Sequence, residues 1–231
     1  MKRRDPRITT VSVLSIAAAV LAGCAQPQHI SFPTPDGGVV HADIYGLGDR
    51  GVVLAHGGRF NKESWATQAQ VLAKAGFRTL AIDFRGRGRS RGGPQATSVD
   101  DVRFDVLAAV RYLHDTGVKT VSVVGASFGG WATAQAAVEA TPGEIDRIVL
   151  LAASAIEEPE RMKGRKLFIT TRDDFSGNGV LRLPEIRDQY ERALQPKQLV
   201  ILDGSAHAQY IFETDQAQRL MREILRFLCD P

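Results

Sequence analysis

The sequence is poor in cysteine, with only Cys24 and Cys229 among 231 residues. Two cysteines cannot make a disulfide framework, and they are too few for a cysteine-rich metal site. The other potential metal ligands do not occur at zinc-like spacings, and neither H-E-x-x-H nor the phosphate-binding pattern G-x-x-x-x-G-K-[ST] is present. We therefore expect no metal and no other cofactor. Cys229 lies in the apolar stretch "ILRFLC", so we expect it to be packed rather than reactive.

The sequence also has little net charge. Its formal net charge is +3 at pH 7, and residues 1–23 contain four of the 29 basic residues but only one of the 26 acidic ones. The rest of the chain therefore carries equal numbers of both signs, whereas electrostatic binding of nucleic acid requires a basic surface. We expect no nucleic-acid partner, and we interpret "RGRGRSRGG" (residues 85–93) as a turn after a strand.

Long apolar runs are absent except near the start, where "ITTVSVLSIAAAVLAG" follows the basic "MKRRDPR". This layout is typical of a secretory signal peptide. It ends in "LAGC", which resembles the lipobox of bacterial lipoproteins, whose cysteine receives a diacylglycerol thioether. The resemblance implies removal of residues 1–23, lipidation of Cys24, and a lipid anchor that holds the protein to a membrane of a bacterial cell envelope, on the secreted side. The alternatives are an ordinary secretory signal with an incidental cysteine, and an uncleaved anchor helix.

We interpret residues 24–38, which are rich in proline, as a tether with turns, and residues 39–231 as one globular domain. In that domain, short apolar segments typical of strands alternate with segments of helical spacing. The alternation predicts an α/β fold, with a mainly parallel twisted sheet and helices on both faces. The expected strands are "VVHADIYG", "GVVLAH", "FRTLAIDF", "TVSVVG", "DRIVLLAA", "KLFITT" and "KQLVILDG"; the expected helices are "KESWATQAQVLAKAG", "SVDDVRFDVLAAVRYLHDTG", "GGWATAQAAVEA", "LPEIRDQYERAL" and "DQAQRLMREILRFL".

Two copies of the pattern G-x-S-x-G occur, "GASFG" around Ser127 and "GRSRG" around Ser90. Ser127 stands between an expected buried strand and an expected helix. A sharp strand-to-helix turn exposes a serine at the carboxyl edge of a sheet, next to the positive end of a helix. Ser90 has no strand directly before it, and "GGPQATS" after it cannot begin a helix. The pattern therefore favours Ser127 as a nucleophile.

A serine hydroxyl needs a base, and the base needs an acid that orients it. His207 follows the expected strand "KQLVILDG", while Asp173 and Asp174 follow "KLFITT". Since parallel strands end at the same edge of a sheet, these side chains are expected near Ser127. Neighbouring side chains of an extended segment point in opposite directions, so only one of the two aspartates can readily face His207.

The segment "VVLAHGGRF" places a glycine-rich loop after another expected strand. Acyl transfer passes through an oxyanion, which backbone N–H groups can bind. One such group comes from the residue after the nucleophile, here Phe128, and the other from this loop, at Gly58 or Arg59. His56 is expected to hold the loop in shape rather than to act as the base.

Five separated motifs carry a family resemblance: "HGG", "DFRGRGRS", "GASFG", "TTRDD" and "GSAH". From about residue 39 to 228 the chain resembles the α/β-hydrolase superfamily, and within it the small serine hydrolases similar to dienelactone hydrolases and acyl esterases. The resemblance implies the α/β-hydrolase fold and a catalytic triad of Ser127, Asp174 and His207. It selects Asp174 because the acid of the family commonly lies three residues after a glycine, whose place Thr171 takes here.

These patterns together predict a serine hydrolase that cleaves an ester-type bond of a small-molecule or acyl substrate through an acyl-enzyme intermediate. The alternatives are a thioesterase or peptidase with the same triad, and a catalytically inactive, lipid-anchored binding protein. Relatives of this fold with an aspartate nucleophile, such as epoxide hydrolases, do not fit a serine at position 127. Only about a dozen residues separate "DRIVLLAA" from "KLFITT", so we expect no sizeable cap domain and an open site.

Overall fold

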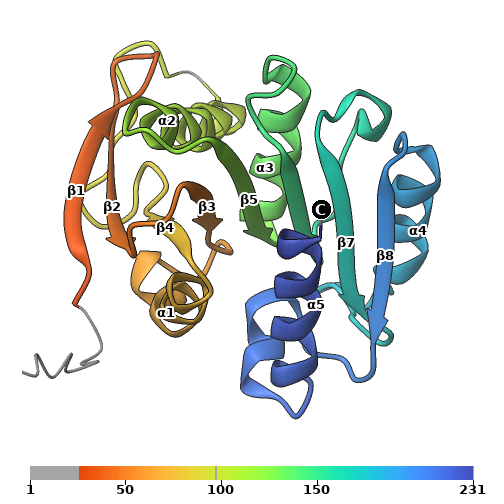
Figure 1. The fold of residues 1–231 in the computed structure, drawn as a ribbon. Coiled ribbons are helices and arrows are strands. Elements are labelled where there is room, and N and C mark those ends of the chain that lie inside the picture. The colour runs from red at the N-terminus through yellow and green to blue at the C-terminus, as the bar shows by residue number, and fades with distance from the viewer. Residues whose placement is uncertain (1–25, 97, 231) are drawn as a thin grey trace, which may run out of the picture.

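In the part of the chain that the computed structural model describes, residues 26–96 and 98–230, eight strands form one sheet in the order β1-β2-β4-β3-β5-β6-β7-β8 (Figure 1). The pairs β1–β2 and β2–β4 are antiparallel, and all the other neighbours are parallel. The predicted α/β fold with a mainly parallel sheet is thus confirmed. The strands are β1 (Gln28–Pro33), β2 (Val39–Tyr45), β3 (Arg50–Ala55), β4 (Phe77–Ile82), β5 (Thr120–Ala126), β6 (Arg147–Leu151), β7 (Arg165–Thr171) and β8 (Lys197–Leu202).

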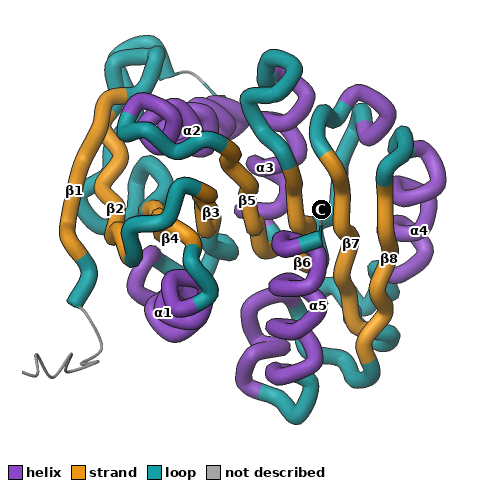
Figure 2. The backbone as a smooth tube through the Cα atoms, viewed as in Figure 1, coloured by secondary structure: helices purple, strands orange, loops and turns teal. Residues whose placement is uncertain are grey.

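Helices cover both faces of the sheet (Figure 2). The side chains of α1 and α5 pack into one apolar cluster, and those of α2, α3 and α4 into another. The apolar side chains of β3 alternate between the two faces of the sheet: Val53 and Ala55 belong to one cluster, and Val52 and Leu54 to the other. Both faces must therefore be covered by helices to keep these side chains from water. The helices are α1 (Ala66–Lys74), α2 (Arg103–Asp115), α3 (Phe128–Glu139), α4 (Leu183–Arg192) and α5 (Ala217–Cys229), with short 3₁₀ segments at Lys62–Trp65, Val99–Val102, Pro159–Arg161 and Ala208–Glu213.

The predicted tether is in part a strand. Residues Gln28–Pro33 form β1, the edge strand of the sheet, and pair antiparallel with β2 (Figure 1). Phe32 is buried there and stacks on Tyr112 of α2, with 5.0 Å between the ring centroids. Proline is tolerated because Pro33 is the last residue of an edge strand, where a missing N–H breaks no inner ladder. The interpretation of residues 24–38 as a tether is therefore wrong for residues 28–33.

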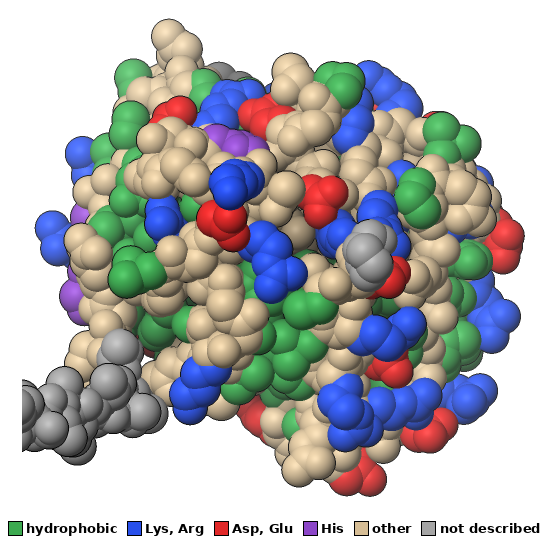
Figure 3. All heavy atoms as spheres, viewed as in Figure 1, with side chains coloured by type: hydrophobic (Ala, Val, Ile, Leu, Met, Phe, Trp, Pro, Cys, Tyr) green, Lys and Arg blue, Asp and Glu red, His purple; other side chains and the backbone are tan. Residues whose placement is uncertain are grey.

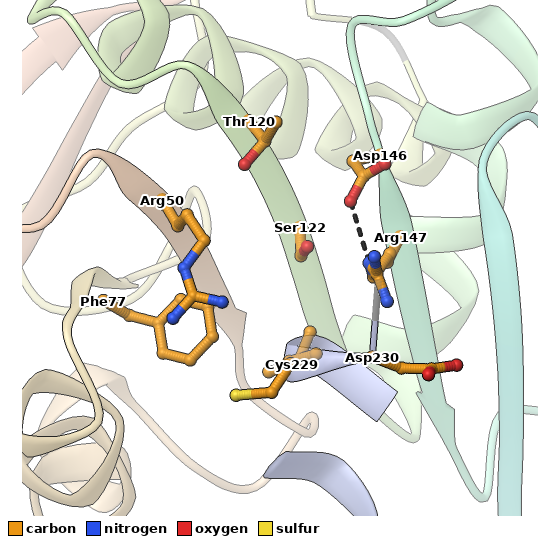
Figure 4. A pocket seen from close by; sticks show the side chains of 10 residues that line it. Arg50, Phe77, Thr120, Ser122, Asp146, Arg147, Cys229 and Asp230 are labelled. Carbon is orange, nitrogen blue, oxygen red and sulfur yellow. Dashed lines mark hydrogen bonds and ion pairs between the residues drawn. The ribbon is translucent and has the colours of Figure 1, made fainter. Parts of the chain in front are cut away.

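A polar cavity of about 290 Å³ lies at the amino ends of the parallel strands, beside the end of α5 (Figure 4). Arg147 lines this cavity, and its guanidinium donates hydrogen bonds to the carboxylate of Asp146 and to the carbonyl of Phe227. These two bonds use much of its hydrogen-bonding capacity. Cys229 lines this cavity and is exposed. The prediction that Cys229 is packed is wrong, because at 100° per residue it points away from the buried side of α5 that Leu220 occupies.

Charged side chains of both signs are interspersed on the face shown in Figure 3. The arginine-rich segment 85–93 forms a tight turn, in which the amide of Gly86 donates to the carbonyl of Ser90 and the amide of Ser90 donates to that of Arg87. The interpretation of this segment as a turn is confirmed.

A buried arginine fixes that turn. Arg85 donates to Asp105 from Nε (3.0 Å) and Nη2 (2.6 Å), and to Asp36 from Nη1 (2.6 Å). Burial raises the pKa of Asp105. Burial also opposes the ionisation of Asp36, but hydrogen bonds from Arg85 and Thr34 hold the pKa of Asp36 below its usual value. One guanidinium thus joins the β1–β2 turn, the turn after β4 and helix α2.

We expect Arg85→Met to lower the free energy of unfolding by about 3–5 kcal/mol, because it leaves two buried carboxylates without their cation. Urea denaturation followed by circular dichroism measures this. The matched control is Arg161→Met, which removes an exposed arginine whose partner is Glu158 and should change stability little. Equal effects of the two substitutions would show that the Arg85 pairs do not support the fold.

Candidate active site

Ser127 occupies a strained turn between β5 and α3. Its backbone angles, φ 50° and ψ −113°, lie in a region that residues with a side chain seldom adopt. Glycines on both sides make the turn possible. A Cβ on Gly129 would lie 2.3 Å from the carbonyl oxygen of Ala55, and one on Gly125 would lie 2.3 Å from the carbonyl oxygen of Gly129. The chain therefore holds Ser127 at the carboxyl edge of the sheet by packing that larger residues would block.

Ser127, His207 and Asp174 form one chain of hydrogen bonds. His207 Nε2 lies 2.8 Å from Ser127 Oγ, and His207 Nδ1 lies 2.7 Å from Asp174 Oδ2. Since a carboxylate can only accept, Nδ1 carries the proton and Nε2 is free to take the proton of the serine. The three residues come from the loops after β5, β7 and β8, so the structure brings together the residues predicted from the sequence.

The two adjacent aspartates differ in their surroundings. Asp174 is fully buried and faces His207, whereas Asp173 is exposed. The amide of Asp173 donates to the carbonyl of Gly204 (3.0 Å), which ties the loop after β7 to the loop after β8. The geometry therefore places Asp174, and not Asp173, in contact with the histidine.

The loop after β3 lies against the start of α3. A Cβ on Gly58 would lie 3.7 Å from the Cβ of Phe128, so the two residues predicted to bind an oxyanion are neighbours. The amide of Gly57 is not free for that purpose, because it donates to Gln209 Oε1 (2.7 Å). Arg87 donates from its side chain to the carbonyl of Gly58, which fixes the loop from outside.

His56 fixes the same loop from inside. The amide of Phe84 donates to His56 Nε2 (3.3 Å), so the ring proton is on Nδ1, which donates to the carbonyl of Gly57 (2.8 Å). Burial lowers the pKa of His56, which favours the neutral ring that both bonds require. The carbonyl of Gly57 also accepts from the amide of Phe60 (2.9 Å). A trans peptide is planar, and its C=O and N–H point in opposite directions. Hydrogen bonds that hold the Gly57 carbonyl therefore also fix the direction of the Gly58 N–H.

Two aromatic side chains stand next to these loops. Phe60 follows the glycine loop, and the amide of Tyr210 donates to the carbonyl of His207 (3.0 Å). Their ring centroids are 4.9 Å apart, and Tyr210 is 38% exposed.

The 152–164 link between β6 and β7 contains only a three-residue 3₁₀ segment, so no cap domain is present in the described chain.

Ser90 has a different role. It is buried, and its Oγ accepts a hydrogen bond from the amide of His41 (2.8 Å), which ties the 85–93 turn to β2. This is the function of a polar residue inside a tight turn. The second G-x-S-x-G copy thus contributes to structure.

Arg182 is a site residue that the sequence patterns did not reveal. Its Nε lies 3.6 Å from Asp174 Oδ1, and its Nη1 donates to Ser154 Oγ (2.8 Å). No motif marks it, because it meets Asp174 only after the 175–181 loop has turned back. The one local signal is an arginine at the N-cap of a helix, where acids and small polar residues are preferred.

Within residues 26–96 and 98–230, no group of three or more His, Cys, Asp or Glu residues could hold a metal ion. No helix in the same ranges is both long enough and apolar enough to cross a membrane. The predicted signal peptide and Cys24 lie outside the described residues.

Comparison with known proteins gives matches over most of the domain. Residues 52–191 match the model of the alpha/beta hydrolase family. A non-heme haloperoxidase from Rhodococcus erythropolis is 30% identical over 118 residues, which are 51% of this chain and 42% of the relative. A bifunctional epoxide hydrolase from Sus scrofa is 35% identical over 81 residues (34% and 14%), and a bifunctional esterase/perhydrolase from Acinetobacter calcoaceticus is 32% identical over 121 residues (52% and 43%). The chain spans less than half of the length of each of these curated relatives.

Among solved structures, an esterase from Pyrococcus furiosus superposes with a TM-score of 0.73 at 20% identity, covering 88% of this chain and 92% of the other. At that identity the likeness concerns the fold.

Proposed function

The chain belongs to the alpha/beta hydrolase family, and on that premise we propose that it is a serine hydrolase that cleaves an ester-type acyl bond with Ser127, His207 and Asp174. The observation that carries the proposal is the unbroken hydrogen-bond chain from Ser127 Oγ to Asp174, at 2.8 Å and 2.7 Å. Such a chain activates a serine hydroxyl, which is a weak nucleophile on its own.

In the proposed mechanism, His207 Nε2 takes the proton of Ser127 as Oγ attacks the acyl carbon. Asp174 stabilises the resulting imidazolium, and the N–H groups of Phe128 and Gly58 bind the negative carbonyl oxygen. The tetrahedral adduct then expels the alcohol, which takes its proton from His207. Water next attacks the acyl-enzyme with His207 as base, which releases the acid and restores Ser127.

A serine at the nucleophile position bears on the choice of reaction. Epoxide hydrolases and dehalogenases of this fold attack with an aspartate, so likeness to an epoxide hydrolase does not extend to this residue. Acyl bonds suit a serine, because the acyl-enzyme is an ordinary ester that water can cleave. Thioesters and amides would follow the same steps, and a panel of ester, thioester and amide substrates with one acyl group separates these reactions. The Phe60–Tyr210 pair beside the site supports substrates with an apolar part.

We expect the full-length protein to hydrolyse p-nitrophenyl acetate, and Ser127→Ala to remove nearly all of this activity because the attacking oxygen is lost. A fluorophosphonate probe, which labels only activated serines, should modify the wild-type protein and not this variant. Ser90→Ala is the matched control, since it changes the serine of the other G-x-S-x-G copy. Activity lost in the Ser90 variant alone would reverse the assignment, and no labelling of the wild type would indicate an inactive binding protein.

We expect Asp174→Asn to lower kcat by about 10⁴-fold, as neutralising the acid of a triad does in serine proteases. The reason is that an amide holds the wrong histidine tautomer and gives no charge for the imidazolium. Asp173→Asn should cost about tenfold or less, about 1.4 kcal/mol of barrier, because Asp173 is exposed. Steady-state kinetics and the folded fraction of both variants, measured side by side, decide the case. A folded but dead Asp173 variant would contradict the assignment.

We also propose that Cys24 carries a lipid that anchors the protein to a bacterial envelope membrane. The support is the order of basic start, apolar run and "LAGC" in the sequence. The anchor would lie four residues before β1 begins at Gln28.

The native N-terminal peptide should therefore start at Cys24 and carry the mass of a diacylglycerol thioether, with or without a further acyl chain. Mass spectrometry of protein isolated from its own membranes measures this, and Cys24→Ser should release the protein from the membrane fraction. A chain that begins at Met1, or an unmodified Cys24, would exclude the anchor.

A further inference from the structure

Two buried polar atoms beside the triad face each other without other partners. Asp174 Oδ1 and Arg182 Nε each lack a hydrogen bond, and they lie 3.6 Å apart. The carboxylate is fully buried, and the side chain of Arg182 is 23% exposed. The two residues are also joined by their backbones, since the amide of Arg182 donates to the carbonyl of Asp174 (2.9 Å).

The position of Arg182 is unfavourable for the helix that it begins. It is the N-cap of α4, where its side chain makes no capping bond. Serine, threonine, asparagine or aspartate would cap the helix, and a cation at the positive end of a helix is destabilising. A residue that breaks a local rule in this way is expected at a functional site. The guanidinium is instead held by Ser154 Oγ (2.8 Å) and directed at Asp174.

A buried carboxylate is costly unless a positive charge or several donors compensate it. His207 donates to Oδ2, but its ring must be neutral before Ser127 attacks the acyl carbon, so it supplies no positive charge at that stage. We propose, on the basis of the proposed function, that Arg182 is a positioning residue of the triad, whose guanidinium supplies the compensating positive charge beside the buried carboxylate of Asp174. The chain of interacting groups is then Ser127–His207–Asp174–Arg182.

The other charged groups on the loop after β7 and on α4 are exposed. On the loop after β7, Arg172 pairs with Asp203 of the loop after β8 (3.6 Å), and Asp173 is exposed. On α4, Glu185 accepts from the amide of Ala155 (2.7 Å), and Arg187 is exposed. In the described chain, the ion pairs of Asp174 are those with His207 and Arg182.

The proposal fixes the sign of a pH effect. Removing a positive charge beside the Asp174–His207 pair makes it easier for that pair to take up a proton, whichever residue holds it. The protonated pair cannot accept the proton of Ser127, so the acid limb of the activity profile must move to higher pH. At high pH the pair is unprotonated with or without Arg182, and the activities converge. A merely structural role would lower activity by the same factor at every pH.

The test compares the full-length wild-type protein with Arg182→Gln, Arg182→Lys and Arg187→Gln. The last variant removes the same charge from an exposed position of the same helix. Ester hydrolysis and the rate of fluorophosphonate labelling are measured from pH 5 to 9. For Arg182→Gln we expect the acid limb to move up by about one pH unit, which gives about tenfold lower activity well below the limb. Above the limb its activity should be close to that of the wild type, while Arg182→Lys and Arg187→Gln should keep the wild-type limb.

An unmoved limb in Arg182→Gln, an equal loss at every pH, or a limb that moves in Arg182→Lys as well would overturn the proposal. If Arg182→Gln does not fold, Arg182→Ser replaces it, because serine caps α4 and still removes the charge. The titration midpoint of the His207 ring, followed by NMR, gives a readout that needs no substrate. A wild type without esterase activity would refute the proposed function, and the midpoint, which must rise in the charge-removing variant, would still decide the role of Arg182.

Discussion

At the turn between β5 and α3, glycines let a helix begin in direct contact with the ends of neighbouring strands. The start of α3 presses on the carbonyls of Ala55 and His56, so a Cβ on Gly129 would overlap both, and a Cβ on Gly130 would lie 2.6 Å from the Cβ of Ala153. This close approach strains Ser127 and also brings Phe128 beside Gly58. The positions of the Ser127 hydroxyl and of the Phe128 and Gly58 amides thus follow from one packing contact. The His207 and Asp174 loops need only reach a point that the sheet has already defined.

Arg85 and Arg182 both meet buried carboxylates, with different geometry. Arg85 binds Asp36 and Asp105 at hydrogen-bond distance. These two ion pairs hold together the β1–β2 turn, the turn after β4 and helix α2. Arg182 stays 3.6 Å from Asp174, too far for a strong hydrogen bond. The strong bond of Asp174 is the one to His207. A partner at this distance contributes its charge without competing for the orientation of the carboxylate, which suits the role proposed for Asp174, beside a histidine whose charge would change during the reaction.

Much of the fold could be predicted from the sequence because parallel strands buried on both faces have uniformly apolar side chains, as "VVL" and "IVLL" do. Ser127 could be found because it directly follows such a strand, and His207 because it lies in the loop just after the last strand, β8. Asp174 required a family spacing, and the structure adds the physical reason, which is that burial distinguishes it from Asp173. The sequence does not predict strand β1, because the prolines around it are typical of turns, although Ile30 and Phe32 alternate with polar residues as in a strand. Arg182 could not be found, because its distance from Asp174 depends on the path of a loop that has no motif.

If Cys24 carries the proposed lipid, the early start of β1 limits how far the domain can lie from the membrane. An extended chain spans at most about 3.6 Å per residue, so a lipid on Cys24 would leave the edge of the sheet within about 15 Å of the bilayer surface. The domain would then diffuse in two dimensions, with its orientation restricted by the short connection. It would meet molecules that partition into the membrane surface far more often than molecules free in the aqueous space.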